Sequence, residues 1–251
     1  MGLADDYRRQ FAWRDWPRAL ALLPDVSGHT VLDLGCGVGD LAAELVRRGA
    51  RVRGFDGNDE LLAAARGRHL DHAEFHRADL RALPADLIAA AAADGIWCSF
   101  AAAYFCDLAP VLRHWLSALR PGGWIALTEV DDMFAHEPVS ERTRTMLARY
   151  VEDGLAARRY DFRMGRRLAG CLREAGCDVR TEITLDDREL AGDGPLSAEV
   201  VAAWDQRLQR MQLLQAFCGD DFGRVRRELL AALAAPNHVS RASVRFVLAH
   251  K

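Results

Sequence analysis

The sequence predicts an α/β domain built on a mainly parallel sheet, and three observations support this. The chain has 251 residues, of which 50% are hydrophobic and 27% charged, so it can bury the core of one large domain or two small ones. Apolar strand patterns alternate with helical patterns from residue 30 to residue 129. The first of these strands leads into a glycine-rich turn. Such alternation is typical of parallel strands joined by helical crossovers.

Residues 1–24 predict an N-terminal amphipathic helix. Aromatic and leucine side chains recur there at helical spacings, as at Tyr7 and Phe11. We expect Pro17 to bend this helix and Pro24 to end it.

Strands and helices then alternate along the expected core, residues 25–130. Apolar runs predict the strands, and apolar residues at i, i+3 and i+4 predict the helices. The expected strands are residues 30–34, 51–55, 73–78, 94–99 and 124–129, and the expected helices are 40–48, 59–68 and 109–119.

The alternation stops after residue 129. The remaining elements expected are helices over 140–159 and 165–175, a strand over 177–185, two helices within 197–235 divided near 219–220, and a strand over 243–249 at or next to the sheet edge. Two helical insertions, 131–162 and 190–238, thus interrupt a single domain of residues 1–251. Insertions after strand ends commonly form a substrate lid, which we expect here. The alternative is that they only cover an exposed sheet face.

The composition indicates which kinds of binding partner and which cellular compartment to expect. The 33 basic and 36 acidic residues give a net charge of -3, which disfavours a nucleic-acid-binding domain. The six cysteines form no C-x-x-C pair, so we expect free thiols in a reducing compartment. The first residues are polar and no apolar run is long enough to span a bilayer, which predicts a cytoplasmic protein without a membrane partner.

The glycine-rich turn carries most of the functional information. Gly35, Gly37 and Gly39 follow a buried strand and precede a helix, so the turn can present bare backbone N–H groups to a ligand. The dinucleotide fingerprint G-x-G-x-x-G would require glycine at position 40. The chain has Asp40 there, and its carboxylate would repel a pyrophosphate. This argues against a nicotinamide or flavin oxidoreductase.

Acidic residues occur at the ends of three successive strands. Asp56, followed by Gly57, is placed to accept hydrogen bonds from ribose hydroxyls. Asp79 is placed to accept from an adenine amino group, with the N–H of Leu80 meeting the ring. A lone Asp after a strand is commonly a helix N-cap. With Asp33 on the first strand, three acids in order predict a nucleoside site instead.

At this point the chain resembles the class I S-adenosylmethionine-dependent methyltransferases. The resemblance covers residues 25–130 and, more loosely, 163–251. The glycine motif of that family, hydrophobic-hydrophobic-D-x-G-x-G-x-G, is matched by residues 32–39. Residues 94–108 resemble the family's fourth strand and the loop after it, and residues 119–123 resemble the turn before its fifth strand.

The resemblance implies a fold, a cofactor and a set of contacts. The fold is a Rossmann-like, seven-stranded, mostly parallel sheet with helices on both faces and one antiparallel strand, here expected at 243–249. The cofactor is S-adenosyl-L-methionine, and the product is S-adenosyl-L-homocysteine. The cofactor-binding residues implied are Asp33, Gly35, Cys36, Gly37, Gly39, Asp56, Gly57, Asp79, Leu80 and Ser99.

Some motifs of the family are missing. Members that methylate base amino groups carry an Asn/Asp/Ser-Pro-Pro-aromatic motif after the fourth strand, whereas residues 97–100 read Trp-Cys-Ser-Phe. Catechol-type members bind magnesium through a spaced Asp/Asn set, whereas Asp131 and Asp132 are adjacent and no matching Asn follows. We therefore expect no nucleic-acid substrate and no metal.

The acceptor side is less defined by sequence. Tyr104 lies near the position where many small-molecule members carry a histidine, so we expect it to shape the pocket. Trp13 is a further candidate for substrate contact, since aromatic faces attract a sulfonium. Glu129 is another, because it lies at the carboxyl end of the fifth strand, where the acceptor is expected. His136 and Asp131 follow the fifth strand and are the candidates for a general base. The alternative for His136 is a surface loop position.

The leading hypothesis is a methyltransferase that acts on a small metabolite. It would transfer a methyl group to an O, N, S or C atom by in-line displacement from the sulfonium in a closed pocket, as a monomer or homodimer. The alternatives are a protein or RNA methyltransferase and a non-catalytic S-adenosylmethionine-binding protein.

Overall fold

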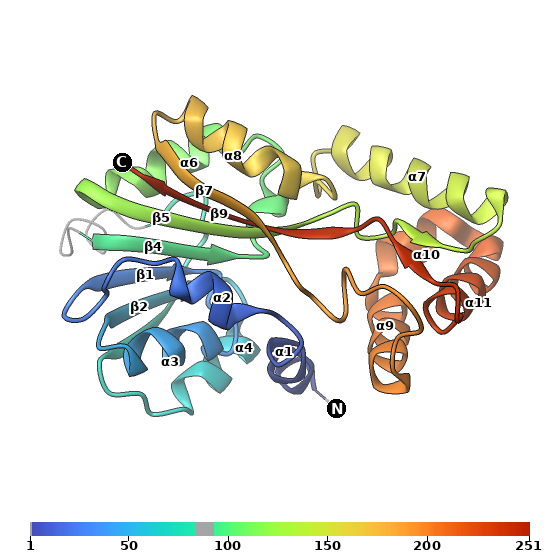
Figure 1. Cartoon of the computed structure of the whole chain (residues 1–251), viewed down its shortest axis with the longest axis horizontal. Coiled ribbons are helices and arrows are strands. Elements are labelled where there is room, and N and C mark those ends of the chain that lie inside the picture. The colour runs from blue at the N-terminus through green and yellow to red at the C-terminus, as the bar shows by residue number, and fades with distance from the viewer. Residues whose placement is uncertain (1, 84–92) are drawn as a thin grey trace.

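The computed structural model describes residues 2–83 and 93–251. In these ranges seven strands form one sheet, in the order β3-β2-β1-β4-β5-β9-β7 (Figure 1). β9 is antiparallel to both of its neighbours, and the pairs from β3 through β5 are parallel. The mostly parallel sheet and its antiparallel strand over 243–249 are therefore confirmed. β9 lies one strand in from the edge.

The strands agree closely with the expected ranges, apart from the fifth. Their bounds are β1 Thr30–Leu34, β2 Arg51–Asp56, β3 Ala73–Arg77, β4 Ala93–Ser99, β5 Leu119–Asp131, β7 Asp178–Leu185 and β9 Ser243–His250. β5 is longer than expected because it continues through the turn at 120–123. A small antiparallel sheet, β6 (His136–Glu137) with β8 (Val239–Ser240), was not expected.

Helices cover both faces of the large sheet. The helices among the described residues are α1 Leu3–Phe11, α2 Trp16–Ala21, α3 Asp40–Arg47, α4 Asp59–Arg66, α6 Leu108–Ser117, α7 Glu141–Ala156, α8 Met164–Glu174, α9 Ala198–Arg210, α10 Gln212–Cys218 and α11 Phe222–Leu233. One buried cluster joins α2, α3 and α4 to one face of the sheet. A second joins α6 and α8 to the other face. Alternate residues of β5 enter the two clusters, as at Trp124 and Ile125.

The N-terminal segment forms two helices rather than one bent helix. The Asp15 side chain accepts a hydrogen bond from the backbone N–H of Arg18, and so caps the start of α2. Pro17 lies in the first turn of α2, where its missing N–H would be unpaired in any case. Pro17 therefore begins a helix, and the expectation that it bends one is corrected.

The second insertion contains three helices in place of the two expected. The division at 219–220 is confirmed, since the short segment Gly219–Asp221 separates α10 from α11. A further break falls at Met211, whose ψ of 69° is not helical. The Gln215 side chain donates to the carbonyls of Leu208 and Gln209 at the end of α9. These bonds satisfy acceptors that the interrupted helix leaves unpaired.

The insertions gather beyond one end of the sheet. Figure 1 shows α7, α9, α10 and α11 together at the end toward which β4 points. Ser140 and Ser197 cap α7 and α9 by accepting hydrogen bonds from backbone N–H groups. In residues 2–83 and 93–251, no helix combines the length and apolar character needed to cross a membrane.

Candidate active site

A cavity of about 980 Å³ lies at the carboxyl ends of β1, β2 and β4. Ligand pockets are typically about 300–1,000 Å³, so this one has room for a cofactor and a small second molecule. The turns after β1, β2 and β3 line one half, which we call the cofactor half. The segment 7–16, α9 and the loop after β4 line the other, which we call the acceptor half.

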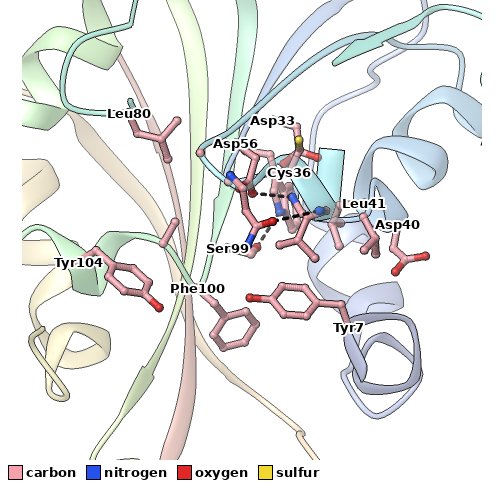
Figure 2. Close-up of a pocket in the computed structure, with 18 of the residues that line it drawn as sticks. Tyr7, Asp33, Cys36, Asp40, Leu41, Asp56, Leu80, Ser99, Phe100 and Tyr104 are labelled. Atoms are coloured by element: carbon pink, nitrogen blue, oxygen red, sulfur yellow. Dashed lines mark hydrogen bonds between the residues drawn. The ribbon is translucent and has the colours of Figure 1, made fainter. Parts of the chain in front are cut away.

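The turn after β1 brings backbone close to the cavity. Gly35 and Gly37 have φ values of 80° and 52°, which L-residues with side chains rarely adopt. A Cβ on Gly35 would lie 2.9 Å from the Cβ of Ala101, so this approach also requires glycine. Figure 2 shows the turn below Asp56, with Tyr7 of α1 opposite.

Asp56 at the end of β2 is tied to the glycine turn. Its Oδ2 accepts a hydrogen bond of 2.9 Å from the N–H of Gly37, and its Oδ1 accepts one of 2.8 Å from Asn58. Each carboxylate oxygen keeps a free lone pair. Asp56 and Gly57 both line the cavity, so the carboxylate can accept hydroxyl hydrogens there.

Asp33 is a buried acid at the base of the cavity. Burial, reinforced by the charge of Asp56, raises its pKa to about 7. Its Oδ2 is buried and has no hydrogen-bond partner in the described part of the chain. Such a group favours a ligand that brings positive charge or hydrogen-bond donors. S-adenosylmethionine carries both, on its sulfonium and its amino group, so the cavity fits this cofactor.

The remaining cofactor candidates come from β3 and β4. Asp79 is exposed and accepts a hydrogen bond from the N–H of Arg81. The carbonyl of Leu80 accepts from the Trp115 indole. The hydroxyl of Ser99 lies 2.7 Å from the indole nitrogen of Trp97. Every cofactor candidate from the sequence lines the cavity except Gly39, which instead forms the left-handed N-cap of α3.

The acceptor half is closed by segments that are far apart in the sequence. In Figure 2 the rings of Tyr7 and Tyr104 lie on either side of Phe100, with their hydroxyls directed toward each other. Tyr160, from the first insertion, packs edge-on against Tyr104 at 4.9 Å between ring centroids. The Arg207 side chain lines the cavity from α9.

Ion pairs hold α1 against α9. The carboxylate of Asp6, which is buried, binds Arg9 on its own helix and Arg210 on α9. Arg9 also donates to the side chain of Gln206. The side chain of Gln10, the residue that follows Arg9 on α1, donates a hydrogen bond to Glu189. Helix α1 therefore covers the cavity as a fixed wall in this structure.

Two sequence candidates for substrate contact do not line the cavity. Trp13 points into the core, where the guanidinium of Arg9 lies 5.8 Å from its ring centroid. Glu129 is fully buried beneath the loop after β4 and accepts hydrogen bonds from the N–H groups of Ala103 and Val130. Burial raises the pKa of Glu129 to about 7. Its place is structural support for the loop that carries Tyr104.

The structure also separates both candidate bases from the cavity. His136 is buried in β6, with its Nδ1 3.0 Å from Nε2 of His238 and its ring edge-on to Trp204. Burial, with the neighbouring His238, lowers its pKa to about 4. Asp131 is paired with Arg166 through contacts of 2.8 and 2.9 Å. Neither residue lines the cavity, so the structure does not bring either candidate base to it.

Several cavity residues were not singled out from the sequence. They include Arg14, Tyr160 and Arg207. No local motif surrounds them, since each resembles many other side chains on amphipathic segments. Across residues 2–83 and 93–251, no group of three or more His, Cys, Asp or Glu residues is arranged to hold a metal ion.

The sheet order, the glycine turn and the three acids define a class I S-adenosylmethionine-dependent methyltransferase. Residues 6–182 match the family described as a methyltransferase domain, and the chain belongs to that family. Its cofactor is S-adenosyl-L-methionine.

Curated relatives share parts of the chain. Methyltransferase GfsG of Streptomyces halstedii is 39% identical over 113 residues, and trans-aconitate 2-methyltransferase of Azoarcus sp. is 41% identical over 110 residues. These matches span about two fifths of each chain, with 42% and 43% of this one and 40% and 42% of the relatives. The ubiquinone biosynthesis O-methyltransferase of Stutzerimonas stutzeri is 29% identical over 181 residues, 70% of this chain and 75% of the relative.

Solved structures share the fold. A Mesorhizobium loti S-adenosylmethionine-dependent methyltransferase superposes with a TM-score of 0.56 at 22% identity, covering 94% of this chain and 97% of that one. A Haemonchus contortus phosphoethanolamine N-methyltransferase 2 in complex with S-adenosyl-L-methionine gives a TM-score of 0.57 at 20% identity, covering 94% of this chain and 52% of that one.

Proposed function

We propose that this enzyme methylates a small metabolite bound in the acceptor half of the cavity. The observation that carries the proposal is the convergence of distant segments around this space. Tyr7 of α1 and Arg207 of α9 line it from segments tied together through Asp6 and Arg210. A concave site walled from several sides suits a small molecule better than a protein or RNA chain, which needs a long open groove.

The cofactor half has a group for each part of S-adenosylmethionine. Asp56 would accept hydrogen bonds from the ribose, Asp79 and Leu80 would meet the adenine, and Asp33 would face the positively charged end. Gly35 and Gly37 would let the ligand reach backbone N–H groups. When bound, the cofactor supplies a methyl group already activated by a sulfonium.

The residues of the chain act mainly by positioning. Holding an acceptor in line with the reacting carbon can contribute about 7–11 kcal/mol at best. Phe100, Tyr104 and Tyr7 line the space where the two molecules would meet, and a bound acceptor would displace water from it. Burial raises the pKa of Tyr104 to about 12, so its hydroxyl stays protonated and orients ligands as a hydrogen-bond donor.

The helical insertions would serve as the wall of the acceptor half. Tyr160 and Met133 of 131–162, and Arg207 of 190–238, line the cavity. Buried residues of α7, α9, α10 and α11 share one apolar cluster with the large sheet. This supports a single domain whose insertions form the substrate lid.

The names of the relatives are consistent with a small acceptor. They include a trans-aconitate 2-methyltransferase and ubiquinone biosynthesis O-methyltransferases. These names support methyl transfer to a small organic molecule, with oxygen as the first atom to test.

The test separates cofactor binding from transfer. Calorimetric titration with S-adenosylhomocysteine should show micromolar binding, and NADH should show none. Methyl-labelled cofactor is then incubated with panels of phenols, carboxylic acids, amines and thiols, and in parallel with bulk RNA and unfolded protein. Label in a small-molecule product supports the proposal. Label only in RNA or protein overturns it, as does cofactor binding with no transfer to any class.

A further inference from the structure

The acceptor half is rich in hydrogen-bond donors and poor in acceptors. Arg14 and Arg207 both line it. In the described ranges, the acidic side chains that line the cavity are Asp33, Asp40, Asp56 and Asp79, and all of them belong to the cofactor half. The two halves thus differ in the side chains they present to the cavity. The described residues of the cofactor half present four acids and two arginines, Arg77 and Arg81, whereas those of the acceptor half present arginines and no acid.

Two buried carboxylates that do not line the cavity hold the guanidinium groups of Arg14 and Arg207 in place. Glu189 is fully buried; its Oε1 accepts from Nη2 of Arg207 at 2.5 Å and its Oε2 from Nη2 of Arg14 at 3.3 Å. Asp187, also buried, lies 3.2 Å from Nε of Arg14. Neither acid lines the cavity. Gln10 adds a third donor to Glu189, so this carboxylate already accepts hydrogen bonds from three side chains of the protein.

Arg207 keeps donors for a ligand. Its Nε is buried and has no hydrogen-bond partner among the residues that the structure describes. Burial acts to lower the pKa of Arg207, but the Glu189 carboxylate outweighs it and the pKa is raised. The group is therefore a fixed cation with a donor left over. An orphaned buried N–H next to a cavity is expected where a ligand completes the bond.

The tyrosines add donors on the same side. Burial raises the pKa of Tyr7, Tyr104 and Tyr160, so all three hydroxyls are protonated at neutral pH. All three line the cavity together with Arg207. A wall of guanidinium and phenol donors complements an anion with several acceptor oxygens.

Aromatic rings form a further part of this wall. Trp16 is stacked on Phe11 at 5.9 Å and edge-on to Phe100 at 6.1 Å between ring centroids. The guanidinium carbon of Arg14 lies 4.6 Å from the Phe100 ring centroid. Flat apolar surfaces of this kind favour a planar ligand body.

Resting on the proposed function, we infer that the methyl acceptor is a carboxylate with a planar apolar body. Arg207, assisted by Arg14, binds its carboxylate, and the rings of Phe11, Trp16 and Phe100 hold its body. The charge of the acceptor is thus a requirement for binding, whichever of its atoms receives the methyl group.

The test measures binding without turnover. With S-adenosylhomocysteine saturating, calorimetry compares benzoate, cinnamate and phenylacetate with their uncharged amides. We expect each acid that binds to do so at least 10-fold more tightly than its amide, as for a charge-assisted hydrogen bond. In Arg207→Gln this preference should disappear. Arg226→Gln is the matched control, because Arg226 of α11 pairs with Asp205 of α9, the helix that carries Arg207, and neither residue lines the cavity.

A second variant guards against misfolding. Arg207→Gln leaves the buried Glu189 with fewer donors, so the double variant Arg207→Gln/Glu189→Gln removes the charge on both sides. Both should bind S-adenosylhomocysteine as the wild type does.

The outcomes for the two proposals differ. If the wild type binds amides as tightly as acids, or binds no acid at all, the inference about the acceptor is overturned. It is also overturned if Arg207→Gln retains the preference for acids. If S-adenosylhomocysteine itself does not bind, the proposed function fails first.

Discussion

Replacing Asp33 by Asn should stabilise the ligand-free protein, but only above acidic pH. The pKa of Asp33 is raised from 3.8 to about 7, by burial and then by the charge of Asp56. Between those two values the native state binds a proton that the unfolded state has lost. Stability due to this group is therefore complete below pH 3.8 and declines as the pH rises through about 7.

The magnitude follows from the two pKa values of this one carboxyl. Their difference corresponds to roughly 4 kcal/mol of stability lost once Asp33 is ionised in both states. Asparagine has no charge to lose, although its amide must also be buried with few partners. We expect Asp33→Asn to exceed the wild type by about 2–4 kcal/mol at about pH 8, and by less than about 1 kcal/mol at about pH 4.

Urea unfolding of both proteins across this pH range, without cofactor, measures the difference. Asp94→Asn is the control with the opposite sign. Hydrogen bonds from Thr30 and Arg120 outweigh burial and lower the pKa of Asp94, so its removal should destabilise the protein at neutral pH and matter less in acid. The reasoning is refuted if Asp33→Asn is no more stable than the wild type at about pH 8, or if any gain is the same at every pH.

Three further variants test the site and its surroundings. Asp56→Ala should weaken S-adenosylhomocysteine binding by about 1–3 kcal/mol, because ribose hydroxyls lose a charged acceptor; calorimetry showing unchanged affinity would contradict the assignment. Gly35→Ala forces a φ of 80° on a residue with a side chain and brings its Cβ to 2.9 Å from Ala101, so thermal unfolding should show a loss of about 1–3 kcal/mol together with weaker cofactor binding. His136→Gln should leave cofactor affinity and turnover near wild type. Because the native pKa of His136 is about 4 against an ordinary 6.5, the wild type should lose stability as the pH falls through this window, and the variant should lose less; equal acid sensitivity in urea titrations would count against this account.

The cofactor half could be predicted because its signals are local. Each of Asp33, Asp56 and Asp79 lies at or near the end of its own strand, and parallel strands bring their carboxyl ends to one edge. The alternation of strands and helices predicts a parallel sheet, whereas the seven-stranded topology with one antiparallel strand came from the resemblance to the family. The glycine spacing at Gly35 and Gly37 then specifies a close backbone approach.

The acceptor half could not be predicted in the same way. Arg14 and Arg207 are brought together by Glu189, a contact between residues far apart in the sequence. Hydrophobic periodicity is a local pattern and does not indicate such a long-range contact. The buried position of His136 could not be predicted for a related reason, since the two-residue strand β6 that contains it gives no strand pattern of its own.

The two halves of the cavity are carried by different stretches of the chain. The acids and glycines of the cofactor half lie within residues 33–79, inside the range 6–182 that matches the family. Glu189 and Arg207 lie beyond that range. Arg207, held by Glu189, thus forms one wall of the acceptor half from outside the matched range, while the segment 7–16, the loop after β4 and Tyr160 form the others from within it. A substitution at Glu189 or Arg207 would therefore change the acceptor half and leave every residue of the family match as it is.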